Sequence, residues 1–174
     1  LSKAAQGRIL IEHGVPMPPL FKTKVQWQQA GSPLVIKKPR HGQGGIGMTL
    51  TDSPIFGGEF VIQQYIPKQR EFRAMMVGNI LAFFMEKSEP EDHNFRWNEH
   101  QGSVWTVVPE DSRLRREIKE IGHKALRALN YDFGAIDIIL CNSILYVLEV
   151  NSRPEFGERN SERFARAVHQ YLNN

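Results

Sequence analysis

The sequence contains a single cysteine, Cys141, and no apolar run long enough to cross a bilayer. One cysteine excludes an internal disulfide. The first residues also lack the basic, apolar and small-residue segments of a signal peptide. The net charge is only +3 and is scattered, and no basic motif interleaved with aromatic residues is present. These absences predict a cytoplasmic protein that binds neither membranes nor nucleic acid.

Residues 134–156 form the most apolar part of the chain, yet they carry two carboxylates and an amide. A polar break at Asn142-Ser143 divides this part into two apolar runs, Ala135 to Leu140 and Leu145 to Val150. Such a pattern is typical of two strands joined by a tight turn. We therefore predict a β-hairpin.

The expected pairing of this hairpin brings its acidic residues together. With a three-residue turn, Cys141 lies opposite Leu145 and Asp137 lies opposite Glu149, on the face that Asn151 also shares. Opposed carboxylates repel each other, so one of them must bind a proton or a cation must lie between them. Two carboxylates and an amide oxygen are hard ligands that suit Mg²⁺ better than Zn²⁺. The alternative is a hairpin at the rim whose acids are solvated.

A glycine-rich loop follows the predicted strand Pro33 to Lys38. Four of the residues from 42 to 47 are glycines, which core packing does not explain because each costs conformational entropy. Such a loop can direct backbone N–H groups at phosphate oxygens, with Lys38 as a point charge at its base. The next residues, Met48-Thr49-Leu50, indicate a strand, whereas the dinucleotide fingerprint and the P-loop both require a helix there. The alternative is a flexible hairpin turn.

The remaining elements follow from periodicity and from turn residues. At 174 residues the chain can form one core or two small lobes. We expect helices at Ser2 to His13, Val25 to Ala30, Ser112 to Leu129 and Glu162 to Leu172, and strands at Glu59 to Ile66 and at Phe72 to Phe84, the latter bent at Gly78-Asn79.

The order of these features resembles the ATP-grasp superfamily, most closely its ribosomal-protein glutamate ligase (RimK-like) branch. The matching motifs are VIKKPRHGQGGIGM, QQYIP, EFR, FRWNEHQG, AIDIIL and LEVN, at residues 35–48, 63–67, 71–73, 95–102, 135–140 and 148–151. The resemblance covers nearly the whole chain. One departure is Gln64, at a position where these ligases usually have glutamate.

This resemblance implies an α+β fold of the ATP-grasp type, with two α/β lobes, antiparallel sheets and ATP between the lobes. The implied organisation is a helical lead-in at 1–18, a small lobe with the glycine loop at 19–62 and a large lobe with the metal-binding strands at 63–174. These enzymes normally have a further α/β domain before this region, and we expect it to be absent here.

The resemblance also assigns roles to individual residues. It implies ATP and two Mg²⁺ or Mn²⁺ ions as cofactors, with Asp137, Glu149 and Asn151 as metal ligands. Arg73, Arg96 and Arg153 are the candidate catalytic residues, which would hold a carboxylate and the transferring phosphoryl group. For Arg153 the alternative is an ordinary surface arginine. The candidate nucleotide contacts are Lys3, Lys38, Gly42, Gly44, Gly45, Gln64, Tyr65, Ile66, Glu71 and Asn98.

The implied function is an ATP-dependent carboxylate–amine ligase that forms an amide bond through an acyl phosphate. Its substrates would be ATP, an unidentified carboxylate and an amine, and an upstream domain or a partner subunit would complete the substrate site. An ATP-grasp phosphotransferase would keep the nucleotide site and change the acceptor. A non-catalytic nucleotide-binding module of a larger assembly is a third hypothesis. The charged set argues against it, because a decayed site has no physical reason to retain opposed carboxylates.

Overall fold

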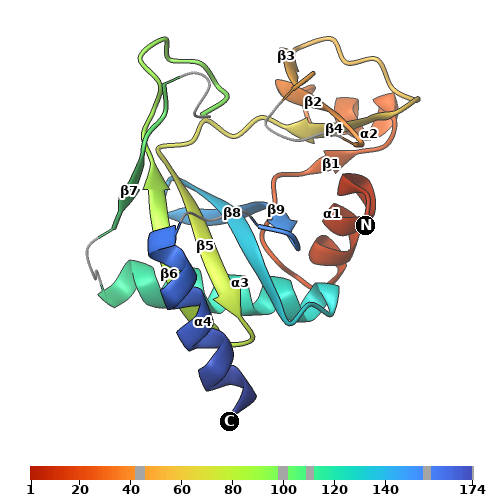
Figure 1. Ribbon diagram of the computed structural model, residues 1–174. Coiled ribbons are helices and arrows are strands. Elements are labelled where there is room, and N and C mark those ends of the chain that lie inside the picture. The colour runs from red at the N-terminus through yellow and green to blue at the C-terminus, as the bar shows by residue number, and fades with distance from the viewer. Residues whose placement is uncertain (42–45, 98–101, 109–111, 155–157, 174) are drawn as a thin grey trace.

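A computed structural model of the chain describes residues 1–41, 46–97, 102–108, 112–154 and 158–173. These residues form two antiparallel sheets and four helices. Figure 1 shows the first sheet in the upper part of the molecule and the second sheet below it, between helices. None of the helices among these residues is long and apolar enough to cross a membrane. The division of the chain at residues 18 and 62 stays a prediction.

The first sheet has the strand order β1-β4-β2-β3. Its strands are β1 (Leu20–Phe21), β2 (Val35–Pro39), β3 (Thr49–Thr51) and β4 (Phe60–Gln64). Helix α2 (Lys24–Gln29) begins after Thr23, whose hydroxyl accepts a hydrogen bond from the Gln26 amide at 3.2 Å. The small core under this sheet consists of Phe21, Trp27, Val35 and Ile62. The sheet carries the strand that ends in the glycine loop.

The second sheet has the order β7-β6-β5-β8-β9. Its strands are β5 (Arg70–Val77), β6 (Ile80–Lys87), β7 (Trp105–Val107), β8 (Phe133–Cys141) and β9 (Ile144–Asn151). Gly78, which has a φ of +54°, allows the tight turn between β5 and β6 at the predicted bend. In the strand order of this sheet, the central strands β5 and β8 each have a neighbouring strand on both sides.

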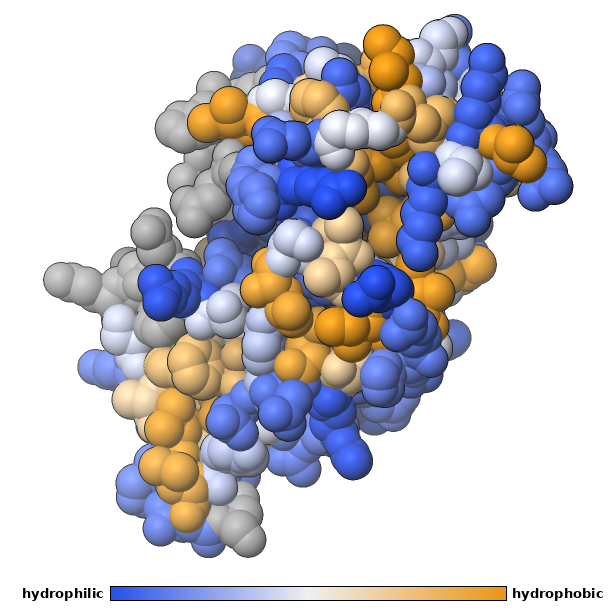
Figure 2. Space-filling view, turned by 90° about the vertical axis from the view of Figure 1, so that its right-hand side faces the viewer, coloured by the Kyte–Doolittle hydropathy of each residue, from blue (hydrophilic) through white to orange (hydrophobic). Residues whose placement is uncertain are grey.

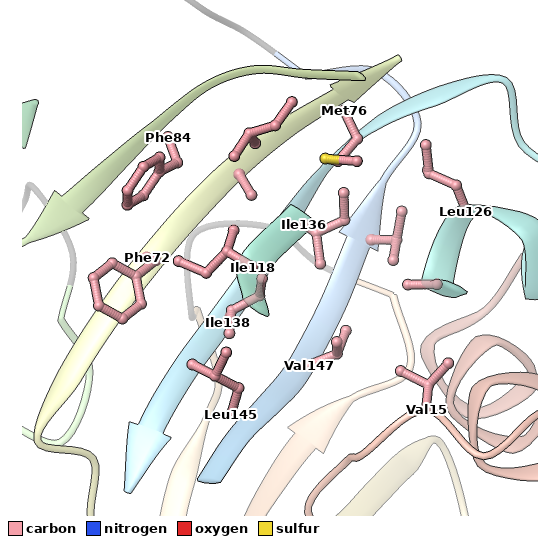
Figure 3. Packing of buried hydrophobic residues seen from close by; sticks show 14 of the residues in the cluster. Val15, Phe72, Met76, Phe84, Ile118, Leu126, Ile136, Ile138, Leu145 and Val147 are labelled. Atoms are coloured by element: carbon pink, nitrogen blue, oxygen red, sulfur yellow. The ribbon is translucent and has the colours of Figure 1, made fainter. Parts of the chain in front are cut away.

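Helices cover both faces of the second sheet. Helix α3 (Ser112–Leu129) lies on one face with α1 (Lys3–Glu12) beside it, and α4 (Glu158–Leu172) lies on the other. Figure 3 shows apolar side chains of α3 and of the strands packed together, including Phe72, Ile118, Leu126, Ile136 and Ile138. This core fixes the second sheet against α3. The opposite face, which α4 covers in part, also carries the polar side chains of the site.

The β8–β9 hairpin is present, but its turn differs from the prediction. The turn has two residues, Asn142 and Ser143, both with positive φ, as in the type I′ turns that suit hairpins. Cys141 therefore pairs with Ile144, and the predicted pairing of Cys141 with Leu145 is wrong.

Asp137 nevertheless lies opposite Glu149, as predicted. The register of the hairpin shifts between Asp137 and Ile138, so that one extra residue of β9 is accommodated there. Without this β-bulge the two-residue turn would place Asp137 opposite Leu148, and Glu149 would point to the other face. The bulge thus determines that the two acids share a face.

Candidate functional site

Asp137 and Arg73 form the centre of a charged cluster on the second sheet. They lie opposite each other on β8 and β5, and the guanidinium donates two hydrogen bonds to the carboxylate, Nε to Oδ1 at 2.7 Å and Nη2 to Oδ2 at 3.0 Å. The Asp137 side chain is nearly buried. Burial opposes the charge of Arg73, but the bond to Asp137 and the nearby Glu149 outweigh it and raise the pKa of Arg73.

Glu149, the other acid of the opposed pair, has its own cationic partner. The Lys3 ammonium lies 3.2 Å from its carboxylate. Lys3 stands at the start of α1, so a residue from the beginning of the chain contacts one near its end. The expected repulsion between the two acids is therefore relieved by two protein cations.

A buried glutamine holds α1 in this place. The Gln6 amide donates to the Val150 carbonyl at 2.8 Å and accepts from the Val150 amide at 2.8 Å, so its side chain binds the outer edge of β9 as a neighbouring strand would. Gln6 lies three residues after Lys3 and hence on the same side of the helix. The double hydrogen bond thus fixes the distance between Lys3 and Glu149.

Replacing Gln6 by leucine is expected to lower the free energy of unfolding by roughly 2 to 4 kcal/mol, because two buried backbone groups of Val150 lose their partners. Urea denaturation followed by circular dichroism measures this loss. Gln28→Leu, on the exposed side of α2, is the control and is expected to change stability by no more than about 0.5 kcal/mol. Equal effects in both variants would show that the Gln6 bonds contribute little.

Lys38 enters the cluster from the first sheet. Side chains alternate along β2, so Lys37 turns to the ring of Phe60, 3.9 Å from its ammonium, whereas Lys38 is buried on the other face. Burial lowers the pKa of Lys38 to about 8, and the attraction of Glu149 only partly offsets this effect. A buried ammonium with a lowered pKa is common at functional sites, because it gains from binding an anion.

Glu71 is buried between two lysines. The Lys87 ammonium lies 2.6 Å from one carboxylate oxygen and that of Lys68 contacts the other. The two ammonium groups also lie over indole rings, Lys68 over Trp97 at 4.6 Å and Lys87 over Trp105 at 4.5 Å. Burial lowers the pKa of Lys68, against the effect of Glu71. Glu71 was a predicted nucleotide contact, and the structure shows it held by basic residues.

The sequence patterns did not point to Lys68, Lys87, Trp97 or Trp105. The sequence signal for Lys87 is its place at the end of the apolar run that forms β6. In the structure this lysine is buried. Together with Lys3, Lys38 and Arg73, the two lysines make five cations around three carboxylates in the described part of the cluster. This surplus of positive charge suits a polyanionic ligand. Figure 2 shows hydrophilic side chains around a hollow between the upper and lower parts of the molecule.

The segment between the two sheets offers a backbone group for a ligand. The Gln64 amide donates to Pro19 and the Tyr65 amide donates to Leu34, both at 2.8 Å. Among the hydrogen bonds of the described residues, none involves the Ile66 amide. A backbone amide without a hydrogen-bond partner costs free energy when it is shielded from water. The Ile66 amide is therefore suited to donate a hydrogen bond to an acceptor atom of a ligand.

The other predicted residues are less integrated into the cluster. Asn151 lies at the exposed end of β9, where its side-chain oxygen accepts from the Arg153 amide at 3.0 Å, and the Arg153 side chain is exposed. The Arg96 guanidinium lies near the ring of Phe95 and donates through Nε to Asn94 at 3.3 Å. Four predicted nucleotide contacts lie outside the described residues: Gly42, Gly44, Gly45 and Asn98.

The family of the chain is decided by comparison with known proteins. The model of the RimK-like ATP-grasp domain matches residues 20–165, which is most of the chain. The chain belongs to this RimK-like ATP-grasp family. The predicted resemblance and the predicted ATP-grasp fold are thereby confirmed.

Relatives of this RimK-like chain include the ribosomal protein bS6–L-glutamate ligase of Escherichia coli O7:K1, strain IAI39. It is 29% identical over 164 residues, which cover 87% of this chain and 53% of that protein. The chain therefore spans about half the length of this curated relative.

Solved structures with the same fold include two enzymes bound to nucleotides. The D-alanine–D-alanine ligase of Bacillus anthracis complexed with ATP superimposes with a TM-score of 0.71 at 14% identity, over 99% of this chain and 65% of that one. The ATP-grasp ligase PsnB complexed with a minimal precursor, Mg and ADP gives a TM-score of 0.69 at 13% identity, over 99% of this chain and 59% of that one. At these identities the likeness shows the fold alone.

The acidic residues of the RimK-like chain fit a hard divalent cation by their chemistry. Asp137 and Glu149 lie on one face, and Asn151 follows Glu149 by two residues on the same strand, so carboxylate and amide oxygens lie along one face of the hairpin. Among the described residues, no group of three or more His, Cys, Asp or Glu side chains gathers in a manner that could hold a metal ion. A cation would therefore need further oxygen ligands, such as those of phosphates.

Proposed function

We propose that this chain is the catalytic part of an ATP-dependent carboxylate–amine ligase. The observation that carries the proposal is the placement of Lys38 on one sheet and of the opposed Asp137 and Glu149 on the other, in a chain of the RimK-like family. Positive groups from the first sheet and a hard-ligand pair from the second are what binding of a metal nucleotide between two sheets requires. The surplus of positive charge supports the same ligand.

The nucleotide contacts follow from this arrangement. Lys38, whose charge is unfavourable while the site is empty of anions, would neutralise phosphate oxygens together with Lys3. The Ile66 amide would donate to the adenine, because the two preceding amides already bind the protein. Gly42, Gly44, Gly45 and Asn98 are proposed contacts on the resemblance alone. Glu71 would act through Lys68 and Lys87, which it holds in place.

Asp137, Glu149 and Asn151 would hold Mg²⁺ or Mn²⁺, and we propose two ions. When bound, the metal offsets the charge of the β- and γ-phosphates. In the structure Arg73 binds Asp137 and Lys3 binds Glu149. When the metal binds the two carboxylates, both cations would exchange these ion pairs for contacts with the ligand. Arg73 would then be free to hold the γ-phosphate or the substrate carboxylate with the same two donors.

The proposed reaction has two steps. A carboxylate oxygen of the first substrate attacks the γ-phosphorus, the bond to the bridging oxygen breaks, and ADP leaves. The amine of the second substrate then attacks the acyl carbon, a C–N bond forms, and the C–O bond to phosphate breaks. Arg73, Arg96 and Arg153 are the proposed holders of the carboxylate and the phosphoryl group.

The name of the curated relative indicates which substrates to test first. That relative is a ligase of L-glutamate and a ribosomal protein, so L-glutamate is the first candidate amine and a protein carboxylate the first candidate acceptor. Because this chain matches only about half of that relative, we propose that an upstream domain or a partner subunit completes the acceptor site.

An isotope experiment tests the proposed reaction. A peptide ending in glutamate is labelled with oxygen-18 in its carboxylates and incubated with ATP, Mg²⁺, L-glutamate and the full-length protein, together with any partner subunit that completes the acceptor site. The expected result is ADP, a peptide heavier by one glutamate residue, and one oxygen-18 atom in the released phosphate, detected by mass spectrometry. ADP with a stable phosphorylated peptide would instead show a phosphotransferase. Nucleotide binding without ADP formation would show a binding module.

A further inference from the structure

β9 is the edge strand of the second sheet, and its pairing with β8 is interrupted at the site. The β-bulge lies between the pairs that Asp137 and Ile138 form with β9, and Leu148 is the extra residue there. An edge strand has a neighbouring strand on one side only, and a bulge disrupts part of that pairing. The strand that carries Glu149 and Asn151 therefore needs support from its outer side.

Residues from the start of the chain supply this support on both sides of the bulge. Before the bulge, the Val147 amide donates to the Pro16 carbonyl at 2.8 Å. After the bulge, the amide and the carbonyl of Val150 both bind the Gln6 side chain, each at 2.8 Å. Figure 1 shows α1 beside the end of β9, where the Gln6 contacts form. The extra residue of β9 is thus held between two contacts with the first residues of the chain.

Gln6 binds the backbone between the two proposed metal ligands of β9. Val150 lies between Glu149 and Asn151, and the Gln6 amide binds its N–H and its C=O. These two groups belong to the two peptide units that join Val150 to its neighbours, and each unit is planar. Holding both groups therefore fixes the directions in which the side chains of Glu149 and Asn151 leave the strand.

Other contacts hold α1 in place independently of Gln6. Leu10 of this helix is fully buried in the core of the second sheet. The Lys124 ammonium of α3 donates to the Gly14 carbonyl, just after the helix, at 2.7 Å. Loss of the Gln6 amide is therefore expected to release β9 and to leave α1, with Lys3 in its first turn, where it is.

We propose that Gln6 is a positioning residue for metal binding, which keeps β9 in its bulged register. The inference rests on the proposed function, in which Glu149 and Asn151 hold Mg²⁺ or Mn²⁺. Without the bulge Glu149 would point to the other face of the sheet, so a slip of one residue removes a ligand. Gln6 acts through the backbone of Val150. Groups that orient metal ligands from behind commonly change metal affinity by roughly 10- to 100-fold.

Isothermal titration calorimetry on the full-length protein tests the proposal by measuring the Kd of ADP twice, with Mn²⁺ and with EDTA. Gln6→Leu is expected to raise the Kd with Mn²⁺ by about tenfold or more. It is expected to change the Kd with EDTA by less than about twofold, because α1 and Lys3 stay in place. Gln6→Asn keeps the amide but is one methylene shorter, and as the milder second variant it is expected to raise the Kd with Mn²⁺ by about threefold or more.

Two controls separate positioning from a general loss of stability. Leu81→Ala truncates a buried side chain on β6, and two strands lie between β6 and β9. This variant is expected to change neither Kd by more than about twofold. The second control repeats Gln6→Leu in the Glu149→Gln background. There one of the ligands that Gln6 positions is already lost, so its effect on the Kd with Mn²⁺ is expected to fall to about threefold or less.

Four results with the variants would overturn the inference. They are an unchanged Kd with Mn²⁺ in Gln6→Leu, an equal loss of affinity with Mn²⁺ and with EDTA, a matching loss in Leu81→Ala, and an undiminished effect in the Glu149→Gln background. Failure of the proposed function gives a different result. In that case Mn²⁺ does not tighten ADP binding even in the wild type, and the metal site itself is wrong.

Discussion

Replacing Lys38 by methionine is expected to weaken ATP binding roughly 100-fold and to raise the melting temperature at pH 7 by roughly 5 to 10 °C. The two effects have one cause. The buried ammonium, whose pKa is lowered to about 8, costs the free protein roughly 3 kcal/mol at pH 7 compared with its charge in the unfolded chain. Methionine has a similar length and no charge, so it removes this cost and the phosphate contact together. Isothermal titration calorimetry and thermal denaturation measure the two effects.

The pH dependence gives this prediction a second, independent signature. Because the pKa of Lys38 is lower in the folded protein than in the unfolded chain, the unfolded chain binds more protons between pH 8 and about 10.5. The wild type therefore gains stability relative to Lys38→Met as the pH rises through this window, and the two proteins converge near its upper end. Lys37→Met, on the opposite face of β2, is the control and leaves ATP binding unchanged. A less stable Lys38→Met variant at pH 7 would contradict the account.

The hairpin shows how far the sequence predicts the site. Apolar runs around Asn142-Ser143 predicted two strands, and Asp137 does lie opposite Glu149. The prediction reached this pairing through two errors that cancel. It assumed a turn that is one residue too long, and it did not include the β-bulge, which adds one residue to β9. The two-residue turn could have been predicted from Asn142 and Ser143, because residues that adopt positive φ suit such a turn. The β-bulge could not have been predicted, because no residue of β9 marks its position.

The charged neighbours of the acids were harder to predict because they come from distant parts of the chain. Gln6 and Val150 are 144 residues apart, and Lys87 and Glu71 are 16 apart on neighbouring strands. Local periodicity predicts which face a residue occupies, but only packing of α1 against β9 brings Gln6 to its partner. The resemblance predicted Lys3 and Arg73 as functional residues. It did not predict that each binds one of the two acids.

Replacing Asp137 by asparagine is expected to lower the free energy of unfolding by about 3 kcal/mol. Repulsion between opposed acids alone would predict a gain in stability. The structure reverses this sign, because Asp137 is nearly buried and neutralises the Arg73 guanidinium through two hydrogen bonds. Asparagine leaves that charge without its counterion. The variant is also expected to lose ADP formation. Urea denaturation at pH 7 measures the stability change.

A double-mutant cycle with Arg73→Gln separates the ion pair from other effects of the substitution. Each single variant leaves one charge of a largely buried pair uncompensated, whereas the double variant leaves none, so it is expected to be more stable than Asp137→Asn alone. Glu149→Gln is the matched control, since its side chain is 38% exposed and its partner Lys3 is partly solvated, and a change of about 1 kcal/mol or less is expected. Additive losses in the cycle would show that Arg73 does not depend on Asp137. In that case Asp137 would contribute to folding through its position in the sheet, and Arg73 would already be free to bind an anion in the absence of nucleotide.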